Sequence, residues 1–364
     1  MKSLPKNPNL DFLKKEAKSL HALHKQHSHQ CLETIRKFDT SFRNQSENEI
    51  FDFKFALNDA QRILAREYGY SSWATLKHYI ESLSAPLYNG VSDSNAYHKT
   101  ITNSYDERSK GYDNSEWHRG LALQTVDYYL PEKGHKVLDI ATGTGTIAFY
   151  AADLVGTEGA VTAIDISEGM LEKCHEKLVD SDFKNLKFEY GDAENLKFKP
   201  NSFDRIYCSS AFFWMSHPQA VLRHWIELLK QGGVIGFNAW PDKSFIWGAA
   251  RRRALKKYGI DFTIHQATGS KQKCKTMLEL AGFENIKIHE VKDGEYLPVE
   301  RGFDTLNDND YAPGQYPHPL TGVPEDILRK ATDDIKAEAK KIETDEGIWH
   351  DKTMYYVYGQ KAHS

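Results

Sequence analysis

The chain has 364 residues, of which 40% are hydrophobic and 27% are charged, and its formal net charge is −4. This composition is ordinary for a globular protein with a sizeable core, and the length predicts two domains. The acidic balance argues against nucleic acid as the main partner, since binding a phosphate backbone favours an excess of Lys and Arg.

The N-terminus and the cysteines bear on where the protein works. The first eight residues contain no apolar segment and so do not resemble a signal peptide. No apolar run approaches the ~18 residues of a membrane-spanning helix. The four cysteines are far apart and form no Cys-x-x-Cys pair. We therefore expect a cytoplasmic protein with no membrane span, no disulfide framework and no zinc site.

Residues 1–84 are expected to form a small all-helical module. Its first helix has apolar residues at helical spacing, namely Leu10, Leu13, Ala17, Leu20 and Leu23. A second helix is expected over 57–68 and a third over 73–80, with a linker near 86–90. The segment 57–77 resembles a short helical module found before ankyrin repeats in bacterial proteins. No ankyrin repeats follow, so this resemblance implies no function, and we expect either homodimerisation or docking on the second domain.

The second region, residues 97–364, alternates strand-like runs with helical segments. The runs expected to be strands are 137–140, 160–164, 186–190, 205–208, 234–238, 286–290 and 354–358. Helices are expected near 146–154, 167–180, 218–230 and 271–281. This alternation predicts an α/β fold with a parallel sheet and helices on both faces.

A glycine-rich loop follows the first of these strands. Residues 142–145 read Thr-Gly-Thr-Gly, and a helix is expected directly after them. Glycine permits a tight turn and lets backbone N–H groups approach a ligand, while the helix N-terminus favours a negatively charged group. The loop alone fits several nucleotide-like ligands, or a tight turn without a ligand.

Three aspartates make a ligand site more specific. Asp139 lies near the end of the first strand, Asp165 ends the second, and Asp192 follows the third. The carboxyl ends of parallel strands meet at one edge of the sheet, where open α/β folds bind ligands. A carboxylate in the position of Asp165 can accept hydrogen bonds from both hydroxyls of a ribose.

With these residues, the region resembles the class I S-adenosylmethionine-dependent methyltransferases. The similar segments are 137–145, 163–166, 191–193, 203–210 and 228–233. Among these enzymes the resemblance is to those related to ubiquinone and menaquinone biosynthesis, which often carry an upstream "YDxxxxxYD" pattern. That pattern is present as Tyr105-Asp106 and Tyr112-Asp113. The resemblance covers roughly residues 100–290. It implies a Rossmann-like seven-stranded methyltransferase sheet and S-adenosyl-L-methionine as cofactor.

The resemblance also implies which residues contact the cofactor. Gly143 and Gly145 would face its methionine part, and Asp165 would bind its ribose. Ile166 and Met170 would lie against the adenine.

Further contacts are implied on the neighbouring strand ends and loops. Asp192 would accept a hydrogen bond from the adenine amino group, with Ala193 beside it, and Ser209 would line the path to the methyl group. The remaining candidate cofactor-binding residues are Tyr105, Tyr112, Asp139, Ala141 and Thr142.

A nicotinamide cofactor is the alternative ligand for the glycine loop. Residues 143–148 fit the pattern G-x-G-x-x-A, and Asp165 follows at a suitable distance. Asp139, however, would place a charge in a strand that nicotinamide-binding folds keep apolar. The Tyr129/Lys133 pair contains Pro131 and precedes the loop, so it is not the catalytic pair of short-chain dehydrogenases.

Two histidines are the candidate general bases. His118 belongs to the upstream segment, and His217 follows the fourth strand at the same sheet edge. A histidine with an ordinary pKa near 6.5 can accept a proton at neutral pH. The bland alternative for each is a surface or helix-entry histidine. Cys208 is expected to be a buried apolar residue rather than a nucleophile.

The acceptor is expected to be a small organic molecule. Aromatic residues are dense between the strands, namely Trp117, Phe212, Phe213, Trp214, Trp240, Phe245, Trp247 and Trp349. They suit an apolar or aromatic substrate, or ordinary packing under loops. Residues 291–350 are expected to form a substrate cap. The basic run 251–253 is either an anion-binding group or a solvated helix face.

Three functions therefore stay open. The first is methylation of a small molecule. The second is methylation of RNA or protein, against which the charge and the sequence after the fourth strand argue. The third is a non-catalytic, cofactor-binding regulatory protein.

Overall fold

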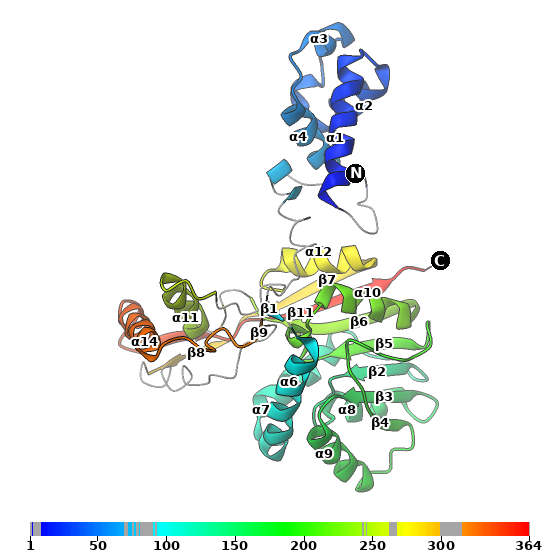
Figure 1. The fold of residues 1–364 in the computed structure, drawn as a ribbon. Coiled ribbons are helices and arrows are strands. Elements are labelled where there is room, and N and C mark those ends of the chain that lie inside the picture. The colour runs from blue at the N-terminus through cyan, green and yellow to red at the C-terminus, as the bar shows by residue number, and fades with distance from the viewer. Residues whose placement is uncertain are drawn as a thin grey trace. The chain divides into compact units, whose positions relative to one another are not determined.

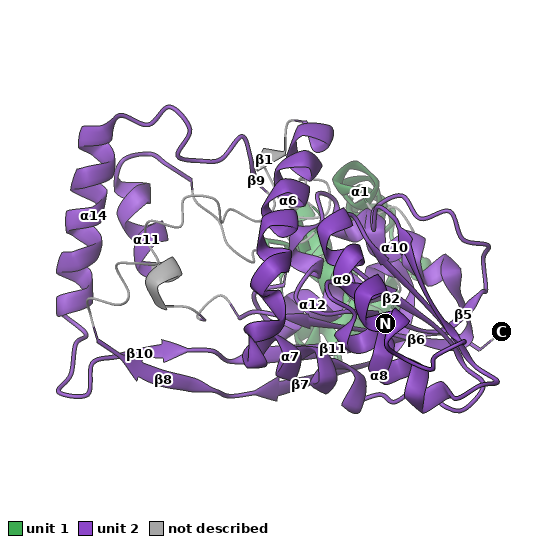
Figure 2. Cartoon of the chain, turned by 90° about the horizontal axis from the view of Figure 1, so that it is seen from below, with its two compact units in different colours: residues 1–87 green, residues 88–364 purple. Residues whose placement is uncertain are grey.

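The computed structural model describes residues 2, 9–68, 72–74, 76–77, 80, 90–91, 93–241, 244, 246–261, 268–298 and 315–363, with the backbone alone at 90–91 and 246–249. The chain divides into two compact units, residues 1–87 and 88–364 (Figure 2). The linker expected near 86–90 lies largely outside the described residues.

The first unit is helical. Its described helices are α1 (Leu10–Lys25), α2 (Leu32–Phe38), α3 (Glu47–Asp52) and α4 (Leu57–Glu67) (Figure 1). Side chains cap their starts: Asn9 accepts from the backbone N–H of Phe12, and Ser46 and Glu49 form a capping box. The first and second expected helices are confirmed, whereas α2 and α3 were missed. The third, over 73–80, is described at only some of its residues, of which Leu76 and Ile80 are buried.

Histidines of this unit serve packing and local pairing. His24 is buried, its Nε2 lies 2.6 Å from the Ile50 carbonyl oxygen, and its ring stacks on Phe55. His27 stacks on Phe51, and His29 lies 3.1 Å from a Glu47 carboxylate oxygen.

The second unit contains a seven-stranded sheet in the order β4-β3-β2-β5-β6-β11-β7 (Figure 1). The strands are β2 (Lys136–Ile140), β3 (Ala160–Asp165), β4 (Leu186–Tyr190), β5 (Phe203–Cys208), β6 (Leu229–Ala239), β7 (Phe283–Val291) and β11 (Met354–Lys361). The pairs among β2 to β6 are parallel, and β11 is antiparallel to both β6 and β7. The Rossmann-like seven-stranded sheet is confirmed, with β11 as its antiparallel member.

Helices cover both faces of this sheet. On one face, α7 (Glu116–Asp127), α8 (Thr146–Val155) and α9 (Glu168–Val179) share a buried cluster with β2, β3 and β4. On the other face, α10 (Pro218–Leu228) packs against β6, and α12 (Lys271–Ala281) packs against β7. This burial of the sheet leaves the carboxyl ends of its parallel strands as the place for a site.

An extension of the second unit projects beyond the sheet, where β7 ends and β11 begins (Figure 2). It contains α11 (Ile246–Lys257), β8 (Gly294–Leu297), α14 (Glu325–Lys340) and β10 (Ile348–Asp351). Strands β8 and β10 pair antiparallel, and α11 packs on α14. A two-residue strand pair, β1 (Gly90–Val91) with β9 (Gln315–Tyr316), lies at its base. Residues 299–314 of the expected cap lie outside the described residues.

The basic run at 251–253 belongs to the interface of α11 and α14. The Arg253 Nε lies 3.0 Å from a Glu338 carboxylate oxygen, and the Lys257 Nζ lies 3.4 Å from Asp334. Arg251 is buried. These charges hold two helices together, which explains part of the run without an anionic ligand.

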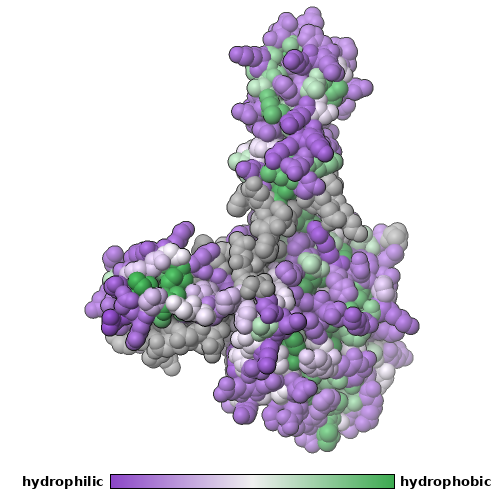
Figure 3. All heavy atoms as spheres, in the orientation of Figure 1, coloured by the Kyte–Doolittle hydropathy of each residue, from purple (hydrophilic) through white to green (hydrophobic). Residues whose placement is uncertain are grey.

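Among the described residues, none of the helices combines the length and apolarity that crossing a membrane requires. On the face drawn in Figure 3, hydrophobic residues lie in small patches among hydrophilic ones.

Candidate functional site

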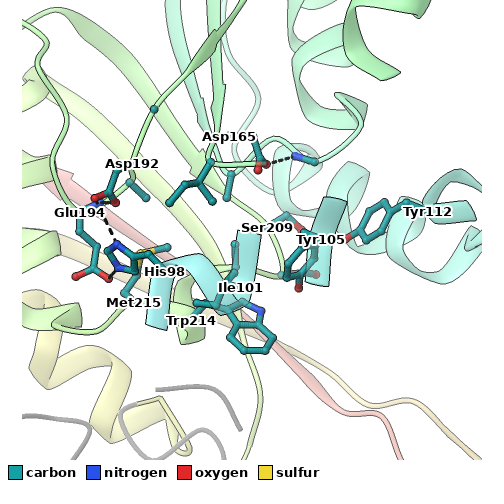
Figure 4. A pocket seen from close by; sticks show the side chains of 17 residues that line it. His98, Ile101, Tyr105, Tyr112, Asp165, Asp192, Glu194, Ser209, Trp214 and Met215 are labelled. Atoms are coloured by element: carbon teal, nitrogen blue, oxygen red, sulfur yellow. Dashed lines mark hydrogen bonds and ion pairs between the residues drawn. The ribbon is translucent and has the colours of Figure 1, made fainter. Parts of the chain in front are cut away.

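A pocket lies at the carboxyl edge of β2, β3, β4 and β5 (Figure 4). We call it the donor pocket. It is lined by His98, Ile101, Tyr105, Tyr112, Ala141, Gly143, Asp165, Ile166, Gly191, Asp192, Ala193, Glu194, Ser209, Ser210, Ala211, Trp214 and Met215. The strand ends and the upstream segment therefore converge as the sequence predicts.

The glycine loop has two glycines with different surroundings. Gly143 has φ +57° and lines the pocket, and a Cβ added there would meet only Tyr112, at 3.6 Å. Gly145 has φ +91° at the N-cap of α8, and a Cβ there would lie 3.0 Å from Phe149 and 3.2 Å from the Cys174 sulfur. Gly143 thus leaves room for a ligand, whereas Gly145 serves the tight turn and its packing.

Asp165 is held rigidly at the centre of the pocket. Its Oδ2 accepts from the Gly143 backbone N–H (2.8 Å), and its Oδ1 accepts from the Ser167 N–H (2.9 Å). Burial raises its pKa to about 6. Each carboxylate oxygen keeps further acceptor capacity, so the group can receive hydroxyl donors from a ligand.

Asp139 is buried one strand away. The Thr142 hydroxyl donates to its Oδ2 over 2.5 Å, and burial raises its pKa to about 7. Asp139 and Thr142 line a second cavity, which lies next to the donor pocket and shares lining residues with it.

The upstream segment closes over the loop through its two aspartates. It comprises α6 (Ser94–Arg108) and the short helix η3 (Ser109–Asn114). The Asp106 carboxylate accepts from the Ser167 hydroxyl (2.6 Å) and from the Gly169 N–H (3.0 Å), at the start of α9. The Asp113 carboxylate accepts from the Thr144 hydroxyl (2.6 Å) and pairs with Lys177 (2.7 Å). The segment is thus fixed to both the glycine loop and α9.

The two tyrosines of the same pattern line the pocket. The rings of Tyr105 and Tyr112 lie 6.4 Å apart, and Tyr105 meets Trp214 edge-on at 6.0 Å. The Arg108 guanidinium lies 4.7 Å from the Tyr105 ring centre. Burial raises the pKa of both tyrosines, so each keeps its hydroxyl proton at neutral pH.

Ser209 and Ser210 follow β5 and are positioned by Asn238, a buried residue of β6. The Asn238 amide donates to the Ser209 hydroxyl (3.0 Å) and accepts from the Ser210 backbone N–H (2.6 Å). Ser210 has φ +54°, which is strained for a residue with a side chain. Among the described residues, its buried hydroxyl has no hydrogen-bond partner.

The second cavity shares five residues with the donor pocket: Tyr112, Ala141, Gly143, Ser209 and Ser210. His118 lines this cavity, and its Nδ1 lies 2.6 Å from the Ser115 hydroxyl. Burial, and then the charge of Arg108, lowers the pKa of His118.

Three predicted site residues, namely Gly145, Met170 and His217, line neither cavity. His217 is exposed at the N-cap of α10 and lines neither cavity. Met170 is fully buried in α9, so it is a core residue. The Cys208 thiol is buried and its pKa is raised, which fits the expected apolar role.

Three residues of the site gave no sequence signal. His98 comes from α6, Glu194 from the loop after β4, and Asn238 from the carboxyl end of β6. None was singled out as a site residue, because their roles arise from contacts across the fold.

Comparison with known proteins agrees with this geometry. Residues 131–241 match the family described as a methyltransferase domain. Aklanonic acid methyltransferase DauC of Streptomyces sp. strain C5 is 32% identical over 146 residues, covering 40% of this chain and 66% of that protein. Ubiquinone/menaquinone biosynthesis C-methyltransferase UbiE of Pseudomonas putida strain F1 is 28% identical over 202 residues, covering 51% of this chain and 78% of that protein.

The chain contains a class I S-adenosylmethionine-dependent methyltransferase domain. The nicotinamide alternative is therefore set aside. Among solved structures, a putative methyltransferase from Bacillus halodurans is 19% identical, with a TM-score of 0.46, covering 66% of this chain and 98% of that chain.

The donor pocket fits the cofactor of a methyltransferase. Gly143 leaves space where another residue would carry a Cβ, Asp165 offers a fixed carboxylate, and the Ser210 hydroxyl is buried and unpaired among the described residues. S-adenosylmethionine supplies a methyl group activated by a positively charged sulfur.

Proposed function

We propose that the protein transfers a methyl group from S-adenosylmethionine to a small organic acceptor with an apolar or aromatic body. The observation that carries this proposal is that the two cavities share one wall, which includes Gly143, Ser209 and Ser210. The nucleoside end of the donor is assigned to Asp165 and Asp192. The acceptor is then assigned to the space around the shared wall, where it meets the methyl group.

The binding assignments rest on side chains that hydrogen bonds within the protein hold in place. Asp165 would accept from the ribose hydroxyls, because two backbone N–H groups orient its carboxylate. Asp192 would accept from the adenine amino group. Asp139 lies on the second-cavity side of the loop, where a carboxylate suits the ammonium group of the methionine part.

We assign His118 as the proton acceptor for an acceptor molecule that keeps its proton at neutral pH. The lowered pKa keeps its imidazole neutral, as a base must be. The Ser115 hydroxyl oxygen accepts from the His118 backbone N–H (3.3 Å) and lies 2.6 Å from Nδ1. When Nδ1 carries the ring proton and donates to Ser115, Nε2 is left as the basic nitrogen.

The balance of the proposed step is simple. The bond between sulfur and the methyl carbon breaks as a bond from the acceptor atom to that carbon forms, and the acceptor's proton moves to Nε2 of His118. Most of the rate would come from positioning and from excluding water, which the clamped upstream segment supports. The names of the relatives DauC and UbiE, which refer to aklanonic acid and to quinone biosynthesis, favour a small acceptor.

The test is a turnover screen with radiolabelled methyl donor over phenols, quinones, amines and thiols. We expect transfer to at least one phenol- or quinone-like compound and its loss in Asp165→Ala. Transfer only to RNA or to protein from a matched extract would contradict the small-molecule assignment. Donor binding without transfer to any class would favour a non-catalytic regulatory protein.

Two further proposals concern the outer parts of the chain. The extension of α11, α14, β8 and β10 is assigned as a substrate cap. Its members α14, β8 and β10 interrupt the sheet domain between β7 and β11, and α11, which follows β6, packs on α14. The first unit is assigned to homodimerisation. Deletion of residues 1–87 that left the mass in solution unchanged would contradict the second assignment.

A further inference from the structure

His98 lies between two carboxylates at one end of the donor pocket (Figure 4). Its Nε2 is 3.1 Å from the Glu194 Oε1, and its Nδ1 is 3.7 Å from the Asp192 Oδ2. The His98 side chain is 19% exposed and that of Glu194 is 14% exposed, so water screens this pair only in part.

The same contacts join three segments that are distant in sequence. Glu194 Oε1 also accepts from the backbone N–H of Ser216 (2.6 Å), and Ser216 is fully buried after β5. Asp192 Oδ1 accepts from the Glu194 N–H (2.9 Å). Helix α6, the loop after β4 and the loop after β5 therefore meet at the imidazole of His98.

The carboxylates that line the donor pocket favour the protonated form of His98. Three carboxylates line the donor pocket, from Asp165, Asp192 and Glu194. Among the described residues that line this pocket, His98 is the only side chain that can carry a positive charge. A neutral imidazole would leave Asp192 and Glu194 close together without a counter-charge, which costs free energy in a partly buried place.

We propose that protonated His98 is a positioning residue of the donor pocket, which holds Asp192 and Glu194 in their binding arrangement, so that donor affinity falls when His98 loses its proton. The proposal rests on the assignment of Asp192 to the adenine amino group. It does not depend on which acceptor is methylated.

The direction of the pH dependence follows from the contacts of the ring. The hydrogen bond with Glu194 raises the pKa of His98 above 6.5, burial opposes this, and the charge of Asp192 adds to it. The other groups near the ring are the Ser216 hydroxyl (3.4 Å) and the Tyr97 ring (6.1 Å) on its own helix. The pKa of His98 therefore lies above 6.5, and the imidazole loses its proton as the pH rises through that higher value.

The experiment is calorimetric titration of the full chain with S-adenosylhomocysteine between pH 6 and 8.5. We expect the wild type to lose about fivefold in affinity through His98 over this range, equivalent to about 1 kcal/mol. His98→Gln should bind about fivefold more weakly than the wild type at pH 6 and match it at pH 8.5. Ionisation of Asp139 near pH 7 would raise donor affinity as the pH rises, and it does so in both proteins. The ratio of the two affinities at each pH is therefore the quantity to compare.

Controls separate positioning from a merely structural role. His175→Gln changes an exposed histidine of α9 and should follow the wild type at every pH. Glu194→Gln removes the main partner of His98. In that background, the affinity difference between the proteins with and without His98→Gln should have its pH midpoint at a lower value. His98→Lys, which stays charged over the whole range, should weaken the pH dependence.

The proposal would be overturned if His98→Gln and the wild type bound S-adenosylhomocysteine with equal affinity at pH 6, with both proteins shown to be folded by circular dichroism. An unchanged midpoint in Glu194→Gln would also overturn it. Failure of the donor site itself is distinguishable, because S-adenosylhomocysteine would then bind neither protein. Failure of the acceptor assignment leaves these titrations unaffected.

Discussion

The donor edge of the sheet and the extension of α11 and α14 are built on opposite principles. At the donor edge, buried carboxylates such as Asp139 and Asp165 are held by hydrogen bonds of 2.5 to 2.9 Å. In the extension, two helices pack through small residues, including Ala250, Ala254 and Ala339, and are joined by exposed ion pairs.

This difference shows where each region can tolerate change. A buried carboxylate costs free energy that only fixed donors or a bound ligand offset, so few residues fit at the donor edge. The exposed ion pairs of the extension tolerate many substitutions, because each such pair contributes little. The donor is thus expected to be bound by an invariant geometry and the acceptor by an adaptable one.

The largest effect is expected for Asp165→Ala. Removing this carboxylate takes away the acceptor for the ribose and the partner of the Gly143 and Ser167 N–H groups. We expect donor affinity to fall by about 100-fold or more, because ligand hydroxyls and buried N–H groups both lose partners. Calorimetry would measure it, and a change below threefold would remove the contrast between the two regions.

The next effect is expected in the second cavity, for His118→Gln. Loss of a general base lowers kcat by about 100-fold or more for an acceptor that must lose a proton. In the wild type, activity should rise with pH through the lowered pKa of His118, below 6.5, and then level off. That rise should be absent in the variant, while donor affinity stays within about twofold. Ser115→Ala should retain the rise but move its midpoint.

A smaller effect concerns the stability of the donor edge without ligand. The folded pKa of Asp139 is about 7, above its ordinary 3.8, so the folded state binds an extra proton and stability falls as pH rises from about 4 to 7. Asp139→Asn should remove this fall and raise the Tm at pH 8, by about 2–4 °C for each kcal/mol recovered. Differential scanning fluorimetry at pH 5 and 8 tests it; an equal Tm change at both values would contradict the burial argument.

The smallest effect is expected in the extension, for Glu338→Gln. The variant weakens the pairs with Arg253 and Lys257 at an exposed interface. We expect a loss of at most about 1 kcal/mol in stability and no change in donor affinity. If the extension is the substrate cap, KM for the acceptor is the parameter that changes. An altered donor Kd would show that the two regions are coupled.

The sequence predicted the sheet better than it predicted the side chains at its edge. Strand periodicity, turn residues and aspartates at strand ends are local signals, and the residues that they pointed to, Asp165 and Gly143, line the pocket. Met170 and His217 line neither cavity, because the direction of a side chain depends on the packing of its helix. His98 and Glu194 were missed because they are 96 residues apart and meet only through the fold.

The attachment of the extension to the sheet has a consequence for how such enzymes diversify. Val291, the last residue of β7, and Met354, the first of β11, are direct partners in the antiparallel ladder. The 292–353 segment therefore leaves and re-enters the sheet at one rung, as the loop of a hairpin does. An insertion of any length at that rung keeps the register of the strands beside it. If the extension is the substrate cap, exchanging this segment between homologues, together with the apolar face of α11, would change the acceptor and leave the methyl donor site in place.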